Sequence, residues 1–419
     1  MNASPTSTLQ TSGLMARAKL SHSAAFISIA IVFTIFTAAS AVPSPLYVVY
    51  QEAWGFSSTT LTFVFAIYVV GLLGSLLTFG ALSDHIGRRP VLGAAVALQT
   101  VSLVFFISAG NIEMLTIARF LQGVATGAAF TTLGAALVDL NPPHAPGRAG
   151  MISGIAPLGG LALGAVGCGA LVQYGPEPTH LVFAILLAAM VFAAAIVALM
   201  PETSSLRPGA RKSLRPRVGI PAGIRKQVYA LVPIMAASWA LAGLYLSLGP
   251  SVSASVFGME SHLVGGLVVT LLCGTGAITA FKLRDWTTDR LLGVAATMLL
   301  AGMVVTLVGL ELESALVAAI GTLIAGVGFG ASSLGTFGTF ALIATPDERG
   351  ELFAVAFVIS YVCFSIPAVI AGYAASTSFG LRASSIVYGI VVAILAALAI
   401  VAQRRTEIAP AEEADAATG

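Results

Sequence analysis

Twelve apolar segments, each of about 20 residues, follow one another along the chain with short polar segments between them. A helix of that length crosses the hydrocarbon core of a bilayer. Of the 419 residues, 57% are hydrophobic and 9% are charged, too few charges to cover a water-soluble surface. The sequence therefore predicts an all-α membrane protein. The predicted spans are 24–42, 61–82, 91–110, 114–138, 149–172, 181–200, 228–248, 263–281, 291–310, 314–342, 352–375 and 383–402.

The first apolar segment has two interpretations. Basic residues precede it, and Ala39, Ser40 and Ala41 match the small-residue cleavage site of a signal peptide. At about 19 residues the segment is also long enough to span, and we expect a retained helix. Pro43 and Pro45 follow directly and should break or bend this helix, where a bend could serve as an outer gate.

Positive charges occupy alternate connecting segments. If the N-terminus is cytoplasmic, all of the 20 Lys and Arg residues except Arg119 and Arg382 fall in cytoplasmic segments or at their edges. Because cytoplasmic loops are enriched in Lys and Arg, we expect twelve helices with both termini cytoplasmic. Residues 1–23 and 403–419 are polar and are expected to be disordered cytoplasmic tails. We expect the chain to lie in the plasma (inner) membrane.

A basic segment rich in proline, 201–227, divides the chain into six predicted helices on each side. We interpret it as a cytoplasmic linker between bundles at 24–200 and 228–402, whose charges could alternatively bind anionic lipid. The two halves look like a parallel duplication, which is the construction of many secondary transporters. One offset of 201 residues relates Asp84 to Asp285, Arg89 to Arg290 and Arg148 to Arg349.

Several classes of function lack sequence support. Cys168, Cys273 and Cys363 lie inside apolar segments, and we expect packing residues rather than a disulfide or metal site. The sequence has no Walker-type phosphate loop and no G-x-S-x-G nucleophile motif. Its short basic loops lack the aromatic residues of a nucleic-acid surface. We therefore expect neither an enzyme, a metal or cofactor protein, nor a nucleic-acid-binding protein.

Two motifs carry a resemblance to a known family. The segment between the second and third spans fits G-x-L-x-D-x-x-G-R-R at Gly80, Leu82, Asp84, Gly87, Arg88 and Arg89. The fourth span fits R-x-x-Q-G-x-x-x-G at Arg119, Gln122, Gly123 and Gly127, and Pro201-Glu202 follows the sixth span. With these residues, the chain resembles the major facilitator superfamily over essentially its whole membrane-embedded length. The resemblance implies secondary active transport of a small molecule by alternating access, by a monomer in the lipid bilayer.

A third motif of that family fits only in part. Many antiporters carry G-x-x-x-G-P-x-x-G-G on helix five, and Gly160, Gly164 and Gly169 match it. Ala165 stands in place of the proline, and Cys168 replaces one glycine. This departure argues against a typical drug antiporter.

The resemblance implies a conformational latch in the loop between helices two and three. Arg88 would pair with Asp139, and Asp84 would face the N-terminus of helix eleven near 350–352. Asp84 and Arg88 are also four residues apart, so one helical turn would bring them together. The alternative is a solvated turn that only fixes orientation. The proposed latch residues are Gly80, Asp84, Gly87, Arg88, Arg89 and Asp139.

Arg119 is the single basic residue inside a predicted span. A cation within a bilayer is costly and usually faces a functional cavity. Gln122 lies on the same helix face, so these two residues and Gly123 are candidates for substrate binding or coupling. The alternative is that Arg119 extends to the membrane surface and pairs with Glu113. Since no carboxylate lies in mid-span, proton coupling depends on the resemblance, with Glu113, Asp139 or a protonated substrate as carrier.

By resemblance, helices one, four, seven and ten line a central cavity. Amphipathic aromatic side chains suit such a site, although each could instead lie in the interfacial belt. We predict proton-coupled efflux of amphipathic or aromatic compounds. The alternatives are proton-coupled uptake of a small anionic or neutral metabolite and, in another class, a non-transporting membrane receptor. Candidate cavity residues besides Gln122 are Tyr47, Tyr50, Trp239 and Tyr245, with Tyr361 more remote.

Overall fold

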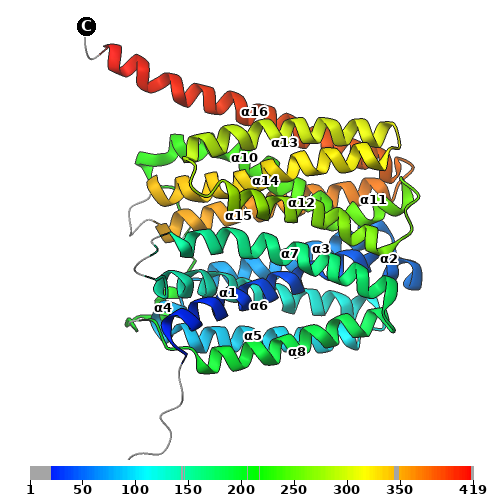
Figure 1. The fold of residues 1–419 in the computed structure, drawn as a ribbon, viewed down its shortest axis with the longest axis horizontal. Helices are drawn as coiled ribbons and strands as arrows, with labels where there is room; N and C mark the ends of the chain where they lie inside the picture. Colours follow the sequence, from blue (N-terminus) through cyan, green and yellow to red (C-terminus); the bar gives the residue numbers. More distant parts are fainter. Residues whose placement is uncertain are drawn as a thin grey trace, which may run out of the picture.

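The computed structural model describes residues 20–142, 145, 147–204, 206–216, 218–343 and 349–416, and the side chains of all of these except 349, 350 and 405–416. Its long helices run side by side along one direction (Figure 1). Twelve helices in the described residues are long and apolar enough to cross a membrane, with His22–Trp54 counted as one. The predicted all-α membrane fold is confirmed.

The helices of the N-terminal half precede the long connection that begins at Met200. They are α1 (His22–Ala41), α2 (Pro43–Trp54), α3 (Ser58–Phe79), α4 (Ser83–Ile86), α5 (Arg88–Ile107), α6 (Ile112–Asp139), α7 (Arg148–Tyr174) and α8 (Pro178–Leu199). The connection contains α9 (Ala210–Ser213) and a 3-10 turn over Ala222–Ile224.

The helices of the C-terminal half repeat the same succession of long spans. They are α10 (Arg225–Ser247), α11 (Gly249–Ser255), α12 (His262–Lys282), α13 (Thr288–Glu311), α14 (Ala315–Ile343), α15 (Arg349–Ala375) and α16 (Gly380–Ala416). The packing is repeated as well: α5 lies against α6 and α8, and α13 lies against α14 and α16. Two similar six-helix bundles result.

Most helix ends depart from the predicted spans by a few residues. The first span is interrupted at Val42 between α1 and α2, as Pro43 predicted, because proline has no N–H to continue the helix. The segment between the predicted spans 61–82 and 91–110 contains α4, and α5 already begins at Arg88. The prediction of a disordered tail from Gln403 is wrong, because α16 continues to Ala416 through a segment rich in alanine and glutamate, both good helix formers. Residues 1–19 of the other predicted tail lie outside the described residues.

Glycines permit close helix contact inside the N-terminal half. A side chain at Gly123 or Gly127 of α6 would collide with the backbone oxygen of Tyr68 or Leu72 on α3. Small residues of this kind let membrane helices approach closely. The two motif glycines of helix four therefore hold α3 against α6. The predicted packing role of the cysteines also agrees with the structure, where Cys168 and Cys273 are buried and all three are free.

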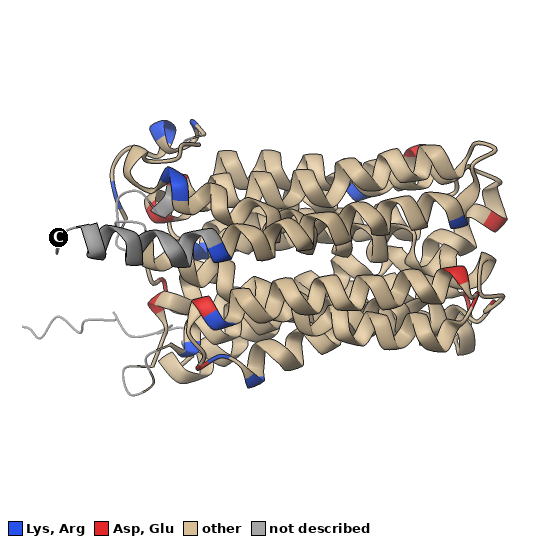
Figure 2. Cartoon of the chain, turned by 90° about the horizontal axis from the view of Figure 1, so that it is seen from above, with Lys and Arg blue, Asp and Glu red and all other residues tan. Residues whose placement is uncertain are grey.

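The two halves meet along α7–α12 and α3–α15. Several hydrogen bonds across this boundary lie at the end opposite α4: Ser44 Oγ donates to Leu246 O at 2.6 Å, and the Thr59 backbone N–H donates to Ser376 Oγ at 2.9 Å. At the same end, Ser261 Oγ donates to Gln173 Oε1 at 3.1 Å. Thr270 Oγ1 also donates to Ala162 O at 3.0 Å, further inside α12 and α7. Charged residues lie mainly at the two ends of the bundle and leave its middle almost uncharged (Figure 2).

Candidate functional site

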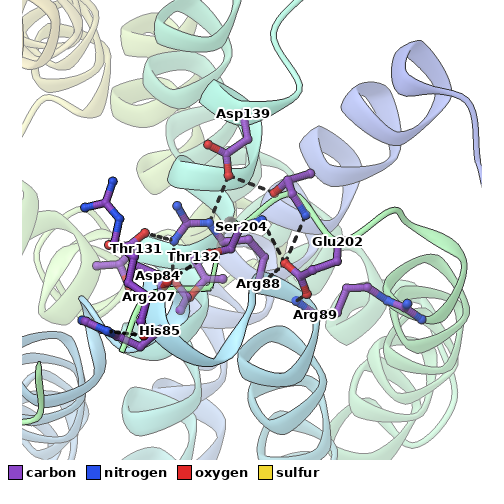
Figure 3. Close-up of polar contacts among 12 residues, drawn as sticks. Asp84, His85, Arg88, Arg89, Thr131, Thr132, Asp139, Glu202, Ser204 and Arg207 are labelled. Carbon is purple, nitrogen blue, oxygen red and sulfur yellow. Dashed lines mark hydrogen bonds and ion pairs between the residues drawn. The ribbon is translucent and has the colours of Figure 1, made fainter. Parts of the chain in front are cut away.

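Arg88 lies at the centre of a charged cluster at the α4 end of the N-terminal half (Figure 3). Its side chain contacts Asp84 Oδ1 at 2.6 Å through Nη1 and Asp139 Oδ2 at 3.1 Å through Nε. Nη1 also donates to Ser83 Oγ at 2.6 Å. Arg88 is only 7% exposed, whereas the Asp84 side chain is 45% exposed. Both expected partners of Arg88 are therefore present around one buried guanidinium group.

Glu202 fixes the start of α5 beside this cluster. Its Oε1 accepts a hydrogen bond from the Arg88 backbone N–H at 2.7 Å, and its Oε2 accepts one from Arg89 N–H at 3.0 Å. A carboxylate satisfies the free N–H groups at a helix N-terminus and is stabilised by the helix dipole. Gly87 has a φ of 107°, and a Cβ there would lie 2.7 Å from Glu202 Oε2, so this position requires glycine.

Arg89 connects the start of α5 to the end of α8. Its Nε donates to Val197 O at 3.2 Å and its Nη2 donates to Ala198 O at 2.5 Å. Cations suit the free carbonyls at a helix C-terminus. Arg89 and Glu202 therefore join two helix ends within the same half. The motif alone identified Arg89 as a latch residue, and the position of Glu202 after helix six gave no sign of its role.

Among the described residues, the contacts of Asp84 also stay within the N-terminal half and the connection after α8. Its carboxylate binds Arg88, and its backbone oxygen accepts hydrogen bonds from Ser204 Oγ at 3.1 Å and Arg207 N–H at 3.2 Å. The predicted contact is with the start of helix eleven near 350–352, where Gly350 is outside the residues whose side chains are described. No hydrogen bond among the described residues joins Asp84 to Glu351 or Leu352, so this contact stays a prediction. In the other half, Asp285 contacts its neighbour Arg284 at 3.5 Å and its side chain is 79% exposed.

Arg119 is buried inside the N-terminal half, only 2% exposed. Its Nη1 donates to Gln122 Oε1 at 2.5 Å and to Ser40 O at 3.3 Å. Its guanidinium carbon lies 4.4 Å from the ring centre of Tyr68 and 5.9 Å from that of Tyr47, close enough for cation–π attraction. None of the ion pairs among the described residues includes Arg119, so the alternative of a surface pair with Glu113 is wrong.

The break between α1 and α2 explains where Gln122 binds. In a continuous helix, the N–H of residue 43 would donate to the Ala39 carbonyl, but Pro43 has none. Gln122 Nε2 donates to Ala39 O instead, at 2.9 Å. The residues that resembled a cleavage site are thus buried in α1, where Arg119 and Gln122 bind their backbone. Arg119 Nε and the Tyr47 hydroxyl keep unused hydrogen-bonding capacity, with no partner among the described residues.

The predicted cavity aromatics separate into different groups. Tyr47 lies by Arg119, whereas Tyr50 stacks on Trp54, with ring centres 4.7 Å apart. The Trp239 and Tyr361 rings lie 4.9 Å apart, so the residue expected to be more remote contacts a predicted cavity residue. Tyr245 lies elsewhere, with its hydroxyl 2.7 Å from Thr322 Oγ1.

An aromatic cluster that the sequence did not single out joins the two halves. Phe364 of α15 lies 4.8 Å from Phe65 of α3 and 6.1 Å from Trp239 of α10, ring centre to ring centre. Tyr68, which carries the shorter cation–π contact of Arg119, follows Phe65 on α3 and bonds Ser40 Oγ at 3.1 Å. Through Tyr68 and Phe65, helix α3 thus connects Arg119 to the aromatic cluster of Phe364 and Trp239 at the boundary between the two halves.

Comparison with known proteins agrees with this architecture. The family model of the Major Facilitator Superfamily matches residues 27–368. The chain belongs to the major facilitator superfamily. It is therefore a membrane transporter rather than an enzyme. The inward open xylose transporter XylE from E. coli superimposes with a TM-score of 0.72 over 90% of this chain and 96% of that one, at 15% identity, which supports the shared fold.

Curated superfamily relatives match over short stretches. A Rickettsia felis transporter is 43% identical over 75 residues, which are 17% of this chain and 18% of that protein. The multidrug resistance protein MdtL of Shewanella oneidensis is 30% identical over 86 residues, 20% of this chain and 22% of that protein. The chain thus matches about a fifth of the length of these relatives, and their activities do not carry over directly.

Proposed function

We propose that this transporter exports small aromatic or amphipathic molecules, uncharged or anionic, in exchange for protons. It would act as a monomer in the plasma membrane, with both termini cytoplasmic and the segment 201–227 linking bundles at 24–200 and 228–402. The basic residues of its alternate connecting segments support that orientation. Its short match to a multidrug resistance protein supports export.

The observation that carries the proposal is the buried, unpaired charge of Arg119. A cation removed from water is costly unless a partner compensates it. Here the partners are neutral: one amide, one backbone carbonyl and two aromatic rings. An electron-rich or anionic group of a substrate would supply the missing compensation, and aromatic side chains nearby would receive its apolar part. A cationic substrate would be repelled.

The experiment uses inside-out vesicles with an acidic interior and a pH-sensitive dye. Benzoate, benzyl alcohol and benzyltrimethylammonium, a cation that cannot lose its charge, each carry one aromatic ring and differ in charge, so they test the charge preference. The passive response of vesicles without the protein is subtracted. Dissipation of the gradient by benzoate or benzyl alcohol, but not by benzyltrimethylammonium, supports the proposal. Vesicles with Arg119→Gln should lose the response. A response to benzyltrimethylammonium alone would refute the charge preference.

Uptake of a small anionic or neutral metabolite is the second candidate. The same unpaired Arg119 favours it, since an anion would be bound equally well in either direction. The direction of labelled benzoate movement under an imposed pH gradient separates the candidates. Relative to vesicles without the protein, in which benzoic acid distributes passively, extra accumulation on the acidic side of the membrane indicates proton exchange. Extra or faster accumulation on the alkaline side indicates proton-coupled uptake.

We further propose that Gly80, Asp84, Gly87, Arg88, Arg89 and Asp139 act as a conformational latch. The contacts of Arg88 with both carboxylates support this role, because they hold α4 to the ends of α5 and α6. The same cluster binds the connection after α8 through Ser204 and Arg207. Movement of that connection would therefore shift the backbone of Asp84.

A further inference from the structure

A cavity lies within the C-terminal half, at the end that carries α11. Its volume of about 400 Å³ is in the range of small-molecule sites. Helices α10 to α14 all contribute to its walls, and Ser385 of α16 completes them. Arg119, Gln122, Trp239 and Tyr361 do not line it. The cavity is thus separate from the residues proposed to bind the transported molecule.

A helix break forms one wall of this cavity. Helix α10 ends at Ser247, and α11 begins at Gly249 with Pro250 in its first turn. Proline cannot continue the backbone hydrogen bonding of the preceding helix, so the span is divided here. Gly249 and Val252 on the far side of the break face the cavity beside Tyr245. Discontinuous membrane helices often adjoin binding sites in transporters.

The walls are mostly apolar and uncharged, with one hydroxyl group from each of five helices. Those of Ser253 and Ser385 donate to backbone oxygens of their own helices. No lining residue is charged. Thr322 Oγ1 donates to Ala318 O at 2.8 Å, so the Tyr245 hydroxyl, 2.7 Å away, donates to Thr322 and retains its capacity to accept. Thr306 Oγ1 is buried and has no hydrogen-bond partner among the described residues. Threonine in a helix commonly bonds the carbonyl four residues earlier, as Thr322 does, whereas the Thr306 hydroxyl is left available to a bound molecule.

The rim of the cavity is apolar and lies on the outside of the helices. Leu316 is exposed on α14, Leu267 is exposed on α12, and Met259 is exposed in the preceding loop. In a membrane, such a rim faces lipid tails rather than water. A molecule dissolved in the bilayer could therefore enter from the side.

We propose that this cavity binds a small uncharged molecule with an apolar body and one hydroxyl or carbonyl group, taken up from the bilayer. The apolar walls hold the body. A hydroxyl group on the molecule can donate to the Tyr245 hydroxyl and bond Thr306 Oγ1, whereas a carbonyl group can only accept a hydrogen bond from Thr306 Oγ1. The site is independent of the Arg119 group, so both sites can be occupied together.

The test uses the full chain in lipid nanodiscs and two radiolabelled probes, with binding to empty nanodiscs subtracted. The probes are 4-propylphenol, which is uncharged at neutral pH, and propylbenzene, which lacks the hydroxyl. Thr306→Val keeps the shape of the side chain and removes its hydroxyl. It should weaken 4-propylphenol binding about five- to tenfold, as for one neutral hydrogen bond, and leave propylbenzene unchanged. Ala319→Phe should reduce binding of both by filling the cavity.

Two controls make the result specific. Thr336 of α14 is also buried with an unpartnered hydroxyl but does not line the cavity, so Thr336→Val should leave 4-propylphenol binding unchanged. Because 4-propylphenol also belongs to the class proposed for the Arg119 group, the comparison is repeated in a Gln122→Leu background, where Thr306→Val should weaken binding by the same factor. Equal binding by the wild type and Thr306→Val would overturn the proposal. So would a loss caused equally by Thr336→Val, or a Thr306→Val effect that disappears in the Gln122→Leu background.

Discussion

Arg88 and Arg119 are two buried arginines of the same half with opposite surroundings. Arg88 contacts two carboxylates, at 2.6 and 3.1 Å, at the edge of the bundle. Arg119 lies inside a span, where its partners are Gln122, a backbone carbonyl and aromatic rings. A buried cation paired with carboxylates helps to stabilise the fold, whereas a buried cation without a carboxylate partner lowers the stability of the folded protein. The difference predicts that Arg88 matters mainly for stability and conformation, and Arg119 mainly for transport.

The largest expected effect is loss of transport in Arg119→Gln, because this change removes the charge proposed to attract substrate. Its folded structure should be as stable as the wild type or more stable, since an unpaired buried cation disappears. Transport in vesicles and thermal unfolding in detergent measure the two effects. Arg284→Gln, which changes an exposed arginine, is the control. Substantial transport by Arg119→Gln would remove the contrast between the two arginines.

Arg88→Gln should reverse this pattern and destabilise the protein. It leaves Asp84 and Asp139 without their shared cation, and lost bonds to charged groups cost about 1.5–3 kcal/mol. The side chains of Asp84 and Asp139 are 45% and 27% exposed, so water offsets part of this loss. Thermal unfolding should occur at lower temperature, and Arg88→Lys should restore part of the stability. If Arg88→Gln unfolds like the wild type, the cluster is not stabilising.

The sequence predicts the fold far better than these two sites. Each membrane span can be recognised locally as a run of about 20 apolar residues. The alternation of Lys and Arg between connecting segments then indicates how many spans there are, and neither pattern depends on how the helices pack. The surroundings of Arg119 depend on which residues of α1 and α3 face it, and neither follows from local sequence. Pro43 is an exception, since its missing N–H leaves the Ala39 carbonyl free for another donor. The role of Glu202 could not be predicted, because it depends on α8 ending beside the start of α5.

Gly87→Ala should cost about 1–2 kcal/mol, because a side chain there is strained at φ 107° and approaches Glu202. The change disturbs the Arg88 cluster through its backbone while leaving every charge in place. Gly93→Ala, on α5 just after this position and with open space around it, is the control and should not destabilise. Equal unfolding temperatures for the two variants would show that the loop tolerates an alanine side chain at this position and that Glu202 moves aside.

Asp84→Asn should have the smallest effect on stability and still reduce transport. Its carboxylate is 45% exposed, so the loss of its charge should cost less than about 1 kcal/mol, while Asp139 continues to bind Arg88. A change of about 1 kcal/mol still alters the ratio of two conformations about fivefold, enough to slow a transport cycle. Asp285→Asn is the matched control from the other half. The Asp285 side chain is 79% exposed, and among the described residues its only ion pair is with Arg284. Normal transport by Asp84→Asn would refute the latch. An equal loss in Asp285→Asn would assign the effect to surface charge, since Asp285 is outside the Arg88 cluster.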